Sequence, residues 1–128
     1  MGKTILVVDD EPIVVEIIRR KLEESGFEVM VAYNGQEALA YFKKKIPHLI
    51  LLDVQMPEMD GYTFIMEKNK VPGYESIPVI VTTAHNEMEP LFKRHGVRAY
   101  LLKPLKLQEL LDKVTEVLGP ACRQAGPS

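Results

Sequence analysis

Three acidic residues, one threonine and one lysine each lie at or next to the end of a short apolar run. These residues are Asp9, Asp10, Asp53, Thr83 and Lys103. If the runs converge, the three carboxylates repel one another, since two like charges about 4 Å apart cost on the order of 4 kcal/mol at an effective dielectric constant near 20. A bound cation is the simplest way to offset this repulsion, so the pattern predicts a metal site.

The chemistry of this set favours a hard divalent cation. Carboxylates and a loop carbonyl are oxygen ligands, and few protein ligands with room for water suit Mg²⁺ or Mn²⁺. Beside such a cation and the Lys103 ammonium, the Asp53 carboxylate is expected to act as the nucleophile of a phosphoryl transfer. The Thr83 hydroxyl is expected to hydrogen-bond an oxygen of the transferred group.

The apolar runs alternate with amphipathic segments along the chain. We expect five strands, at residues 4–8, 27–32, 49–52, 77–82 and 97–102. We expect a helix after each strand, from Pro12 to Ser25-Gly26, from 35 to about 44, from 62 to about 70, from 85 to 95 and over 107–118. This alternation is typical of α/β proteins built from βαβ units, with a parallel sheet covered on both faces.

A flavodoxin-like doubly wound sheet with strand order 2-1-3-4-5 is the expected topology, and its switch point lies between strands 1 and 3. Asp9, Asp10 and Asp53 then meet at the switch point. Thr83 and Lys103 reach the same edge of the sheet. The alternative is that the three carboxylates merely end their strands.

Local signals predict several helix features. Glu11 and Pro12 suit the start of the first helix, where an acid interacts well with the helix dipole. Asn34 predicts an N-cap for the second helix, with Glu37 three residues later. Pro90 confines regular helix within 85–95 to the residues after it. In the first helix, a stripe at helical spacing predicts the inward face: Val14, Ile17, Ile18 and Leu22.

The composition indicates one ordinary domain. The chain has 128 residues, of which 46% are hydrophobic and 27% charged, and its formal net charge is -2. Nothing in this balance predicts a nucleic-acid or membrane surface. The single cysteine, Cys122, excludes an internal disulfide, and without a secretory signal or a spanning run the protein is expected to be cytoplasmic. The domain is expected over residues 1–119, with 120–128 as a flexible tail or a truncated linker.

Taken in order, these motifs resemble the receiver domain of bacterial two-component response regulators, the chemotaxis-regulator fold. The resemblance extends from residue 4 to about 118. The matching residues are the Asp9-Asp10 pair, Asp53 with Met56-Pro57 and Asp60-Gly61, Thr83-Ala84, and Tyr100 with Lys103-Pro104.

The resemblance implies that Asp53 accepts a phosphoryl group from a phosphohistidine of a sensor histidine kinase or a phosphotransfer protein. It implies that Asp10 binds Mg²⁺ directly, that Asp9 helps through water, and that the Gln55 backbone carbonyl completes the protein ligands with Asp53. The chain is thus expected to be a signalling switch that catalyses its own phosphotransfer and autodephosphorylation, and not a metabolic enzyme.

The resemblance also implies a switch. Lys103 contacts the phosphoryl group, Thr83 moves toward it, and Tyr100 turns inward and reshapes the face formed by helix 4, strand 5 and helix 5. His85 and Gln55 flank the path of water and are expected to tune dephosphorylation. The output is expected to be a partner or a fused effector domain, with a phosphorylation-dependent homodimer as one form of it.

Three alternatives stay open at this point. A flavin-binding flavodoxin shares the architecture, but its first loop must cradle a phosphate, and Asp9-Asp10-Glu11 would repel one. A phosphatase of the haloacid dehalogenase type needs its nucleophile on strand 1 with a second acid two residues later, where Glu11 is a poor substitute. An interaction module that keeps the fold without phosphorylation is opposed by the complete residue set.

Overall fold

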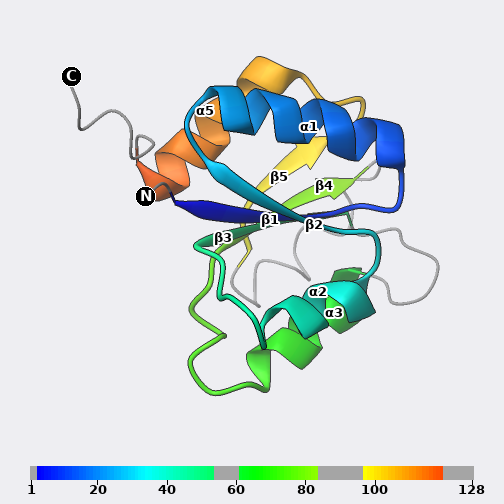
Figure 1. Cartoon of the computed structure of the whole chain (residues 1–128), viewed down its shortest axis with the longest axis vertical. Coiled ribbons are helices and arrows are strands. Elements are labelled where there is room, and N and C mark those ends of the chain that lie inside the picture. The colour runs from blue at the N-terminus through cyan, green and yellow to red at the C-terminus, as the bar shows by residue number, and fades with distance from the viewer. Residues whose placement is uncertain (1–2, 54–60, 84–96, 120–128) are drawn as a thin grey trace.

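The chain folds around a parallel sheet of five strands (Figure 1). The computed structural model describes residues 3–53, 61–83 and 97–119. In chain order, the strands are β1 (Thr4–Val8), β2 (Glu28–Ala32), β3 (Leu49–Asp53), β4 (Val79–Thr83) and β5 (Val97–Leu102). They lie side by side in the order β2-β1-β3-β4-β5, and every neighbouring pair is parallel. The predicted doubly wound order is therefore confirmed.

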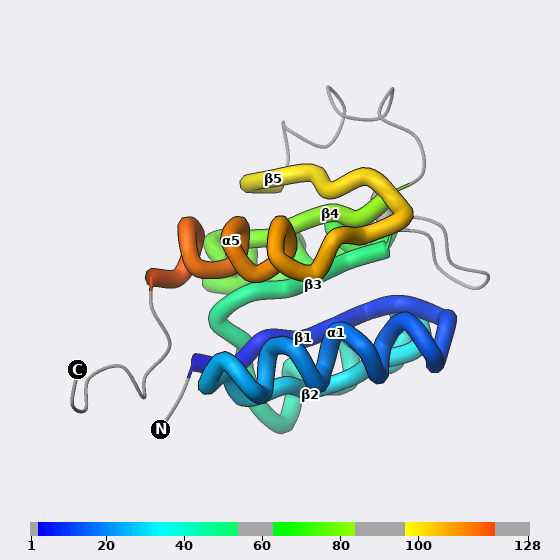
Figure 2. Tube along the Cα trace, turned by 90° about the horizontal axis from the view of Figure 1, so that it is seen from above, coloured from blue at the N-terminus to red at the C-terminus, as the bar shows by residue number. Residues whose placement is uncertain are grey.

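The described helices form two layers, one on each face of the sheet (Figure 1), and Figure 2 shows one of these layers from above. They are α1 (Pro12–Glu24), α2 (Gly35–Tyr41), α3 (Gly61–Asn69) and α5 (Leu107–Leu118). α1 and α5 pack together on one face, and α2 and α3 pack together on the other. None of the helices in the described part of the chain has the length and apolar character to cross a membrane. The helix expected over 85–95 and the tail expected over 120–128 lie outside the described residues.

The central strands are buried on both faces, as their continuous apolar runs predict. Every residue of β1, β3 and β4 is buried. Alternate side chains divide between two core clusters. One cluster joins Leu6, Val8, Ile50, Leu52, Val79 and Val81 to residues of α2 and α3, including Ala38 and Phe64. The other joins Ile5, Val7, Leu49, Leu51 and Ile80 to residues of α1 and α5, including Leu22 and Leu110.

The N-cap of α2 is confirmed, but its C-terminal end differs from the prediction. The Asn34 side chain accepts a hydrogen bond of 2.8 Å from the Glu37 backbone N–H, and Glu37 accepts one of 2.7 Å from the Tyr33 N–H. The helix ends at Tyr41 and not at about Lys44. Beyond Tyr41 the chain continues in turns. In one of them, the Lys44 N–H donates a hydrogen bond to the Tyr41 carbonyl, three residues back.

The buried stripe of α1 is rotated from the predicted one. Val15, Ile18 and Leu22 are its buried residues, whereas Ile17, expected on the inward face, is 47% exposed. Neighbouring α5 lies beside α1 on the same face of the sheet, and the packing of both helices decides which side of α1 is covered. With Ile13, which is 76% exposed, Ile17 forms an apolar strip on the surface of α1.

Candidate functional site

The carboxyl ends of β1 and β3 bring the three predicted aspartates together. Asp9 and Asp10 follow β1, Asp53 is the last residue of β3, and the two strands are neighbours in the sheet. One carboxylate oxygen from each aspartate lies within 4.8 Å of the others. Asp9 and Asp53 are only 2% and 3% exposed, so their mutual repulsion is poorly screened by water.

The pKa of Asp9 reflects its burial beside other carboxylates. Burial is the largest influence and raises the pKa of Asp9 to about 6; the nearby Asp53 and Glu11 carboxylates add to the increase, while the Glu11 N–H and Lys103 oppose it. The Glu11 backbone N–H donates a 3.0 Å hydrogen bond to Asp9 Oδ1. The increase in the pKa of Asp9 thus comes mainly from the loss of hydration on burial, with the neighbouring carboxylates as a smaller cause.

Lys103 reaches the same pocket from the segment that follows β5. Its ammonium nitrogen lies 3.2 Å from Asp53 Oδ2, 3.6 Å from Asp9 Oδ2 and 3.5 Å from Glu11 Oε1. Burial disfavours the charged ammonium, but the three carboxylates outweigh that penalty and raise the pKa of Lys103 above its ordinary value. The peptide bond between Lys103 and Pro104 is cis. Lys103 is thus a cation in contact with the acidic pocket.

Thr83 and Tyr100 lie on the strands next to this pocket. Thr83 ends β4, is 2% exposed, and accepts a 2.8 Å hydrogen bond at its carbonyl from the Lys103 N–H. Tyr100 lies on β5, is half-buried, and packs against the core cluster on the α2 and α3 face. The structure therefore places Thr83 at the edge of the sheet where the aspartates and Lys103 meet. Gln55 and His85 lie outside the described residues.

The residues present fit a hard divalent cation. The cluster consists of carboxylate oxygens from Asp9, Asp10 and Asp53, with no sulfur or imidazole ligand among the described residues that form it. Oxygen-only ligand sets suit Mg²⁺ or Mn²⁺, whereas Zn²⁺ sites favour Cys and His. A bound cation would also offset the mutual repulsion of these clustered carboxylates.

Sequence reasoning missed one member of the site. The sequence predicts only that Glu11 complements the dipole of α1, yet the Glu11 carboxylate lies 3.5 Å from the Lys103 ammonium. The available signal was its position directly after Asp9-Asp10. That spacing places a fourth acid at the same sheet edge, although only the folded chain shows that it reaches Lys103.

A largely apolar hollow of about 450 Å³ adjoins Glu11 and Lys103. Glu11 and α1 line it from one side, and residues of the segment 103–107 line it from the other. The apolar lining residues are Val14, Ile17, Ile18, Pro104, Leu105 and Leu107. Glu11 and Lys103 therefore lie between the acidic pocket and an apolar surface.

Known proteins share both the sequence pattern and the fold. The profile of the response regulator receiver domain matches residues 5–115. The uncharacterized 14.6 kDa protein in the sodA1 3′ region of Leptolyngbya boryana is 40% identical over 114 residues, which are 88% of this chain and 87% of that protein. The probable transcriptional regulator ycf27 of Porphyra purpurea is 39% identical over 116 residues, which are 89% of this chain and 46% of that regulator. The chain therefore spans most of the first relative but about half the length of the second.

Solved structures agree with this assignment. The response regulator protein TrrA of Thermotoga maritima, solved in complex with Mg(2+)-BeF, matches with a TM-score of 0.80 and 34% identity, covering 91% of this chain and 99% of that one. The matching profile, the strand order and the acidic cluster beside Lys103 lead to one assignment. The chain belongs to the family of response regulator receiver domains.

Proposed function

We propose that residues 1–119 form a cytoplasmic receiver domain that accepts a phosphoryl group on Asp53 in a reaction that needs Mg²⁺ or Mn²⁺. The donor is a phosphohistidine of a sensor histidine kinase or a phosphotransfer protein. One observation carries the proposal: the buried Asp53 carboxylate lies 3.2 Å from the Lys103 ammonium and shares a cluster with Asp9 and Asp10. A buried carboxylate beside a cation and a pair of acids that could bind a metal is equipped for phosphoryl transfer.

Each residue of the site has a separate role in this reaction. An Asp53 carboxylate oxygen attacks the phosphorus, the bond from phosphorus to the imidazole nitrogen breaks, and the histidine leaves with that electron pair. Asp9, Asp10, Asp53 and the Gln55 backbone carbonyl would hold the cation, which supplies positive charge to the phosphoryl oxygens when bound. Lys103 adds a second positive charge, and the Thr83 hydroxyl donates a hydrogen bond to a phosphoryl oxygen.

In this proposal, phosphorylation of Asp53 changes the surface around β5. The bond from the Lys103 N–H to the Thr83 carbonyl supports such coupling, because it joins the ends of β4 and β5. Thr83 moves toward the phosphoryl group and Tyr100 turns inward, which reshapes the face formed by residues 85–95, β5 and α5. That face controls a partner or a fused effector domain, and a phosphorylation-dependent homodimer is one form of this output.

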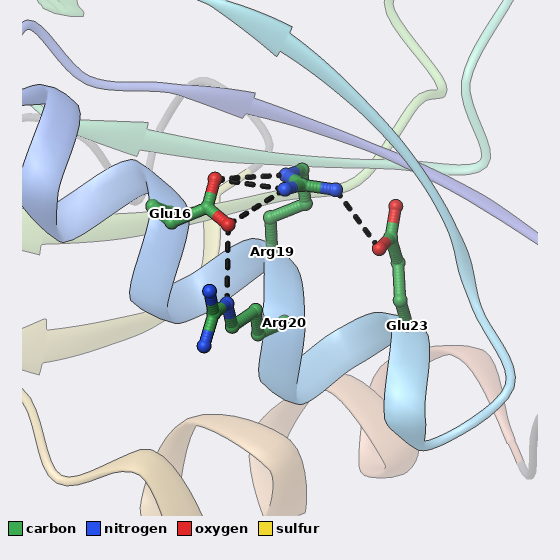
Figure 3. Close-up of polar contacts among 4 residues, drawn as sticks. All are labelled: Glu16, Arg19, Arg20 and Glu23. Carbon is green, nitrogen blue, oxygen red and sulfur yellow. Dashed lines mark hydrogen bonds and ion pairs between the residues drawn. The ribbon is translucent and has the colours of Figure 1, made fainter.

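The α1 surface favours a protein as the phosphoryl donor. Ile13 and Ile17 are 76% and 47% exposed, and they line a shallow hollow with Glu16 and Arg20. The Glu16 carboxylate forms ion pairs with the Arg19 guanidinium at 2.7 Å and with the Arg20 guanidinium at 3.2 Å (Figure 3). The charged side chains beside the apolar strip are therefore paired along the helix. An apolar strip bordered by paired charges suits a protein surface better than a small anion.

Intact-protein mass spectrometry after incubation with acetyl phosphate tests the proposal. With Mg²⁺, the protein is expected to gain one labile phosphoryl adduct, and the adduct is expected to be absent without the metal and in Asp53→Asn. A folded protein that gains no adduct, and whose melting temperature does not respond to Mg²⁺, would overturn the proposal in favour of an interaction module with the same fold.

A further inference from the structure

The Lys103 ammonium is shared between two buried carboxylates and one carboxylate at the rim. Asp53 and Asp9 lie 3.2 and 3.6 Å from it, and their side chains are 4% and 3% exposed. Glu11 lies 3.5 Å from the same nitrogen, but its side chain is 60% exposed. Of these three carboxylates, Glu11 is the one outside the cluster that can hold a metal.

The Glu11 side chain does not cap α1 in the described part of the chain. Glu11 occupies the N-cap position, yet its carboxylate accepts no hydrogen bond from a backbone N–H of the helix. The bond from Glu11 to Asp9 is made by the Glu11 backbone N–H. The carboxylate can therefore be neutralised while the backbone contacts that position Asp9 stay in place.

Charge balance separates Glu11 from the aspartates once a metal is bound. A divalent cation and the Lys103 ammonium together balance the charges of Asp9, Asp10 and Asp53. Glu11 is a fourth carboxylate, and its charge remains unbalanced. The bound cation weakens the attraction of Asp9 and Asp53 for Lys103, whereas the exposed Glu11 at the rim keeps its attraction.

We propose that Glu11 is a positioning residue that holds the Lys103 ammonium through an ion pair and thereby slows phosphoryl uptake by Asp53. This inference rests on the function proposed above. To contact an incoming phosphoryl oxygen, the Lys103 ammonium must break its ion pair with Glu11. The negative charge of Glu11 also repels the anionic donor. An exposed ion pair of this kind changes a rate by roughly two- to fivefold.

The test compares Glu11→Gln with the wild type and with Glu24→Gln as the control. Glu24 is exposed at the far end of α1, so the control removes one negative charge away from the site. Each protein is mixed with acetyl phosphate and MgCl₂, and the adduct on Asp53 is followed by intact mass. In this reaction an Asp53 oxygen bonds to phosphorus, the bond from phosphorus to the acetyl oxygen breaks, and acetate leaves with the electron pair.

Glu11→Gln is expected to gain the adduct roughly two- to fivefold faster than the wild type in low salt. The gain is expected to shrink in 1 M KCl, where the screening length falls to about 3 Å. A second readout needs no turnover: with Mg²⁺ present, the beryllofluoride concentration that gives half of the melting-temperature shift is expected to fall in Glu11→Gln. Glu24→Gln is expected to match the wild type in both assays.

Other results would overturn the inference in distinguishable ways. A wild type that gains the adduct, with Glu11→Gln no faster, would show that Glu11 does not restrain Lys103. An equal gain in Glu24→Gln would show an effect of overall charge and not of position. A wild type that gains no adduct at all would overturn the proposed function, and this inference would fall with it.

Discussion

The Lys68 ammonium, near the end of α3, donates a 2.8 Å hydrogen bond to the backbone carbonyl of Tyr74. The Lys68 side chain is completely buried, and the same nitrogen donates a 2.9 Å bond to Asn69 Oδ1. Tyr74 in turn donates from its hydroxyl to the Phe42 carbonyl at 3.2 Å and packs edge-on against the Phe42 ring. Lys68 thereby joins α3 to the segment that leads into β4, at the cost of burying an ammonium group.

We expect Lys68→Met to stabilise the protein at pH 7. Burial lowers the pKa of Lys68 to about 8, with a small opposing effect of Glu75. The folded state therefore disfavours the proton that the unfolded state binds, and the penalty is full below pH 8 and vanishes above the ordinary lysine pKa near 10.5. After the lost hydrogen bond to Tyr74 is subtracted, the expected gain is about 1–2 kcal/mol in the free energy of unfolding.

Urea denaturation of Lys68→Met and the wild type across pH 7–10.5 measures this difference. The advantage of the variant is expected to shrink steadily as the pH rises above 8. The exposed Lys43 provides the matched control, because Lys43→Met removes a lysine without relieving any burial. A variant that is less stable than the wild type at pH 7 would mean that the bond to Tyr74 outweighs the desolvation of Lys68.

Asp9→Asn is expected to stabilise the metal-free protein at pH 7 by about 1–2 kcal/mol. Burial raises the pKa of Asp9 to about 6, so between pH 4 and pH 6 the folded state keeps a proton that the unfolded state releases. The wild type therefore loses stability as the pH rises through this window. The advantage of Asp9→Asn is expected to be largest at pH 7 and to vanish toward pH 4.

Thermal unfolding with and without Mg²⁺ completes this prediction. Mg²⁺ is expected to raise the melting temperature of the wild type more than that of Asp9→Asn, because the variant loses one charge from the metal-binding cluster. Asp112→Asn, an exposed change on α5, is expected to respond to pH and Mg²⁺ as the wild type does. Equal Mg²⁺ responses in the wild type and Asp9→Asn would exclude Asp9 from the metal site.

Lys103→Met is expected to slow phosphoryl uptake from acetyl phosphate by roughly 100-fold, because it removes a cation positioned at the phosphoryl oxygens. The rate of adduct formation, measured by intact mass with saturating Mg²⁺, checks this. Lys106→Met is the control, since Lys106 is exposed at the start of α5. A change of less than about threefold in Lys103→Met would remove Lys103 from the proposed mechanism.

The resemblance to receiver domains implies that residue 85 borders the path of water to the phosphoryl group, so His85→Ala is expected to change the lifetime of the phosphoryl group on Asp53. Loss of the adduct after removal of acetyl phosphate gives the lifetime. His95→Ala, further along the chain and outside the motif, is the control. An unchanged lifetime in His85→Ala would show that this side chain does not influence hydrolysis.

The assembly of the acidic pocket followed from sequence because parallel strands end at one edge of their sheet. Apolar runs that alternate with amphipathic segments predict such a sheet. In the strand order 2-1-3-4-5, strands 1 and 3 are neighbours, so the acids at the ends of β1 and β3 lie close together. The Asn34 cap was predictable for the same kind of reason, since it depends on residues within one helical turn.

Burial within the helices did not follow from local pattern. The segment Met66-Glu67-Lys68-Asn69-Lys70 looks polar and exposed, yet Lys68 is fully buried because α3 and the residues around Tyr74 close over it. In α1, Val15 is buried, whereas Ile17, which the pattern predicts to face inward, is exposed. The packing of α1 against the sheet and α5 sets the rotation of this helix.

The sequence by itself therefore determined the order of the elements, the doubly wound sheet and the edge where Asp9, Asp10, Asp53, Thr83 and Lys103 come together, since these depend on periodicity and strand polarity. Only the tertiary structure decided which of these groups touch. The sharing of Lys103 among Asp53, Asp9 and Glu11, and the burial of Lys68, depend on how helices and loops pack against the sheet. Such packing joins residues far apart in the chain, and no local pattern encodes it.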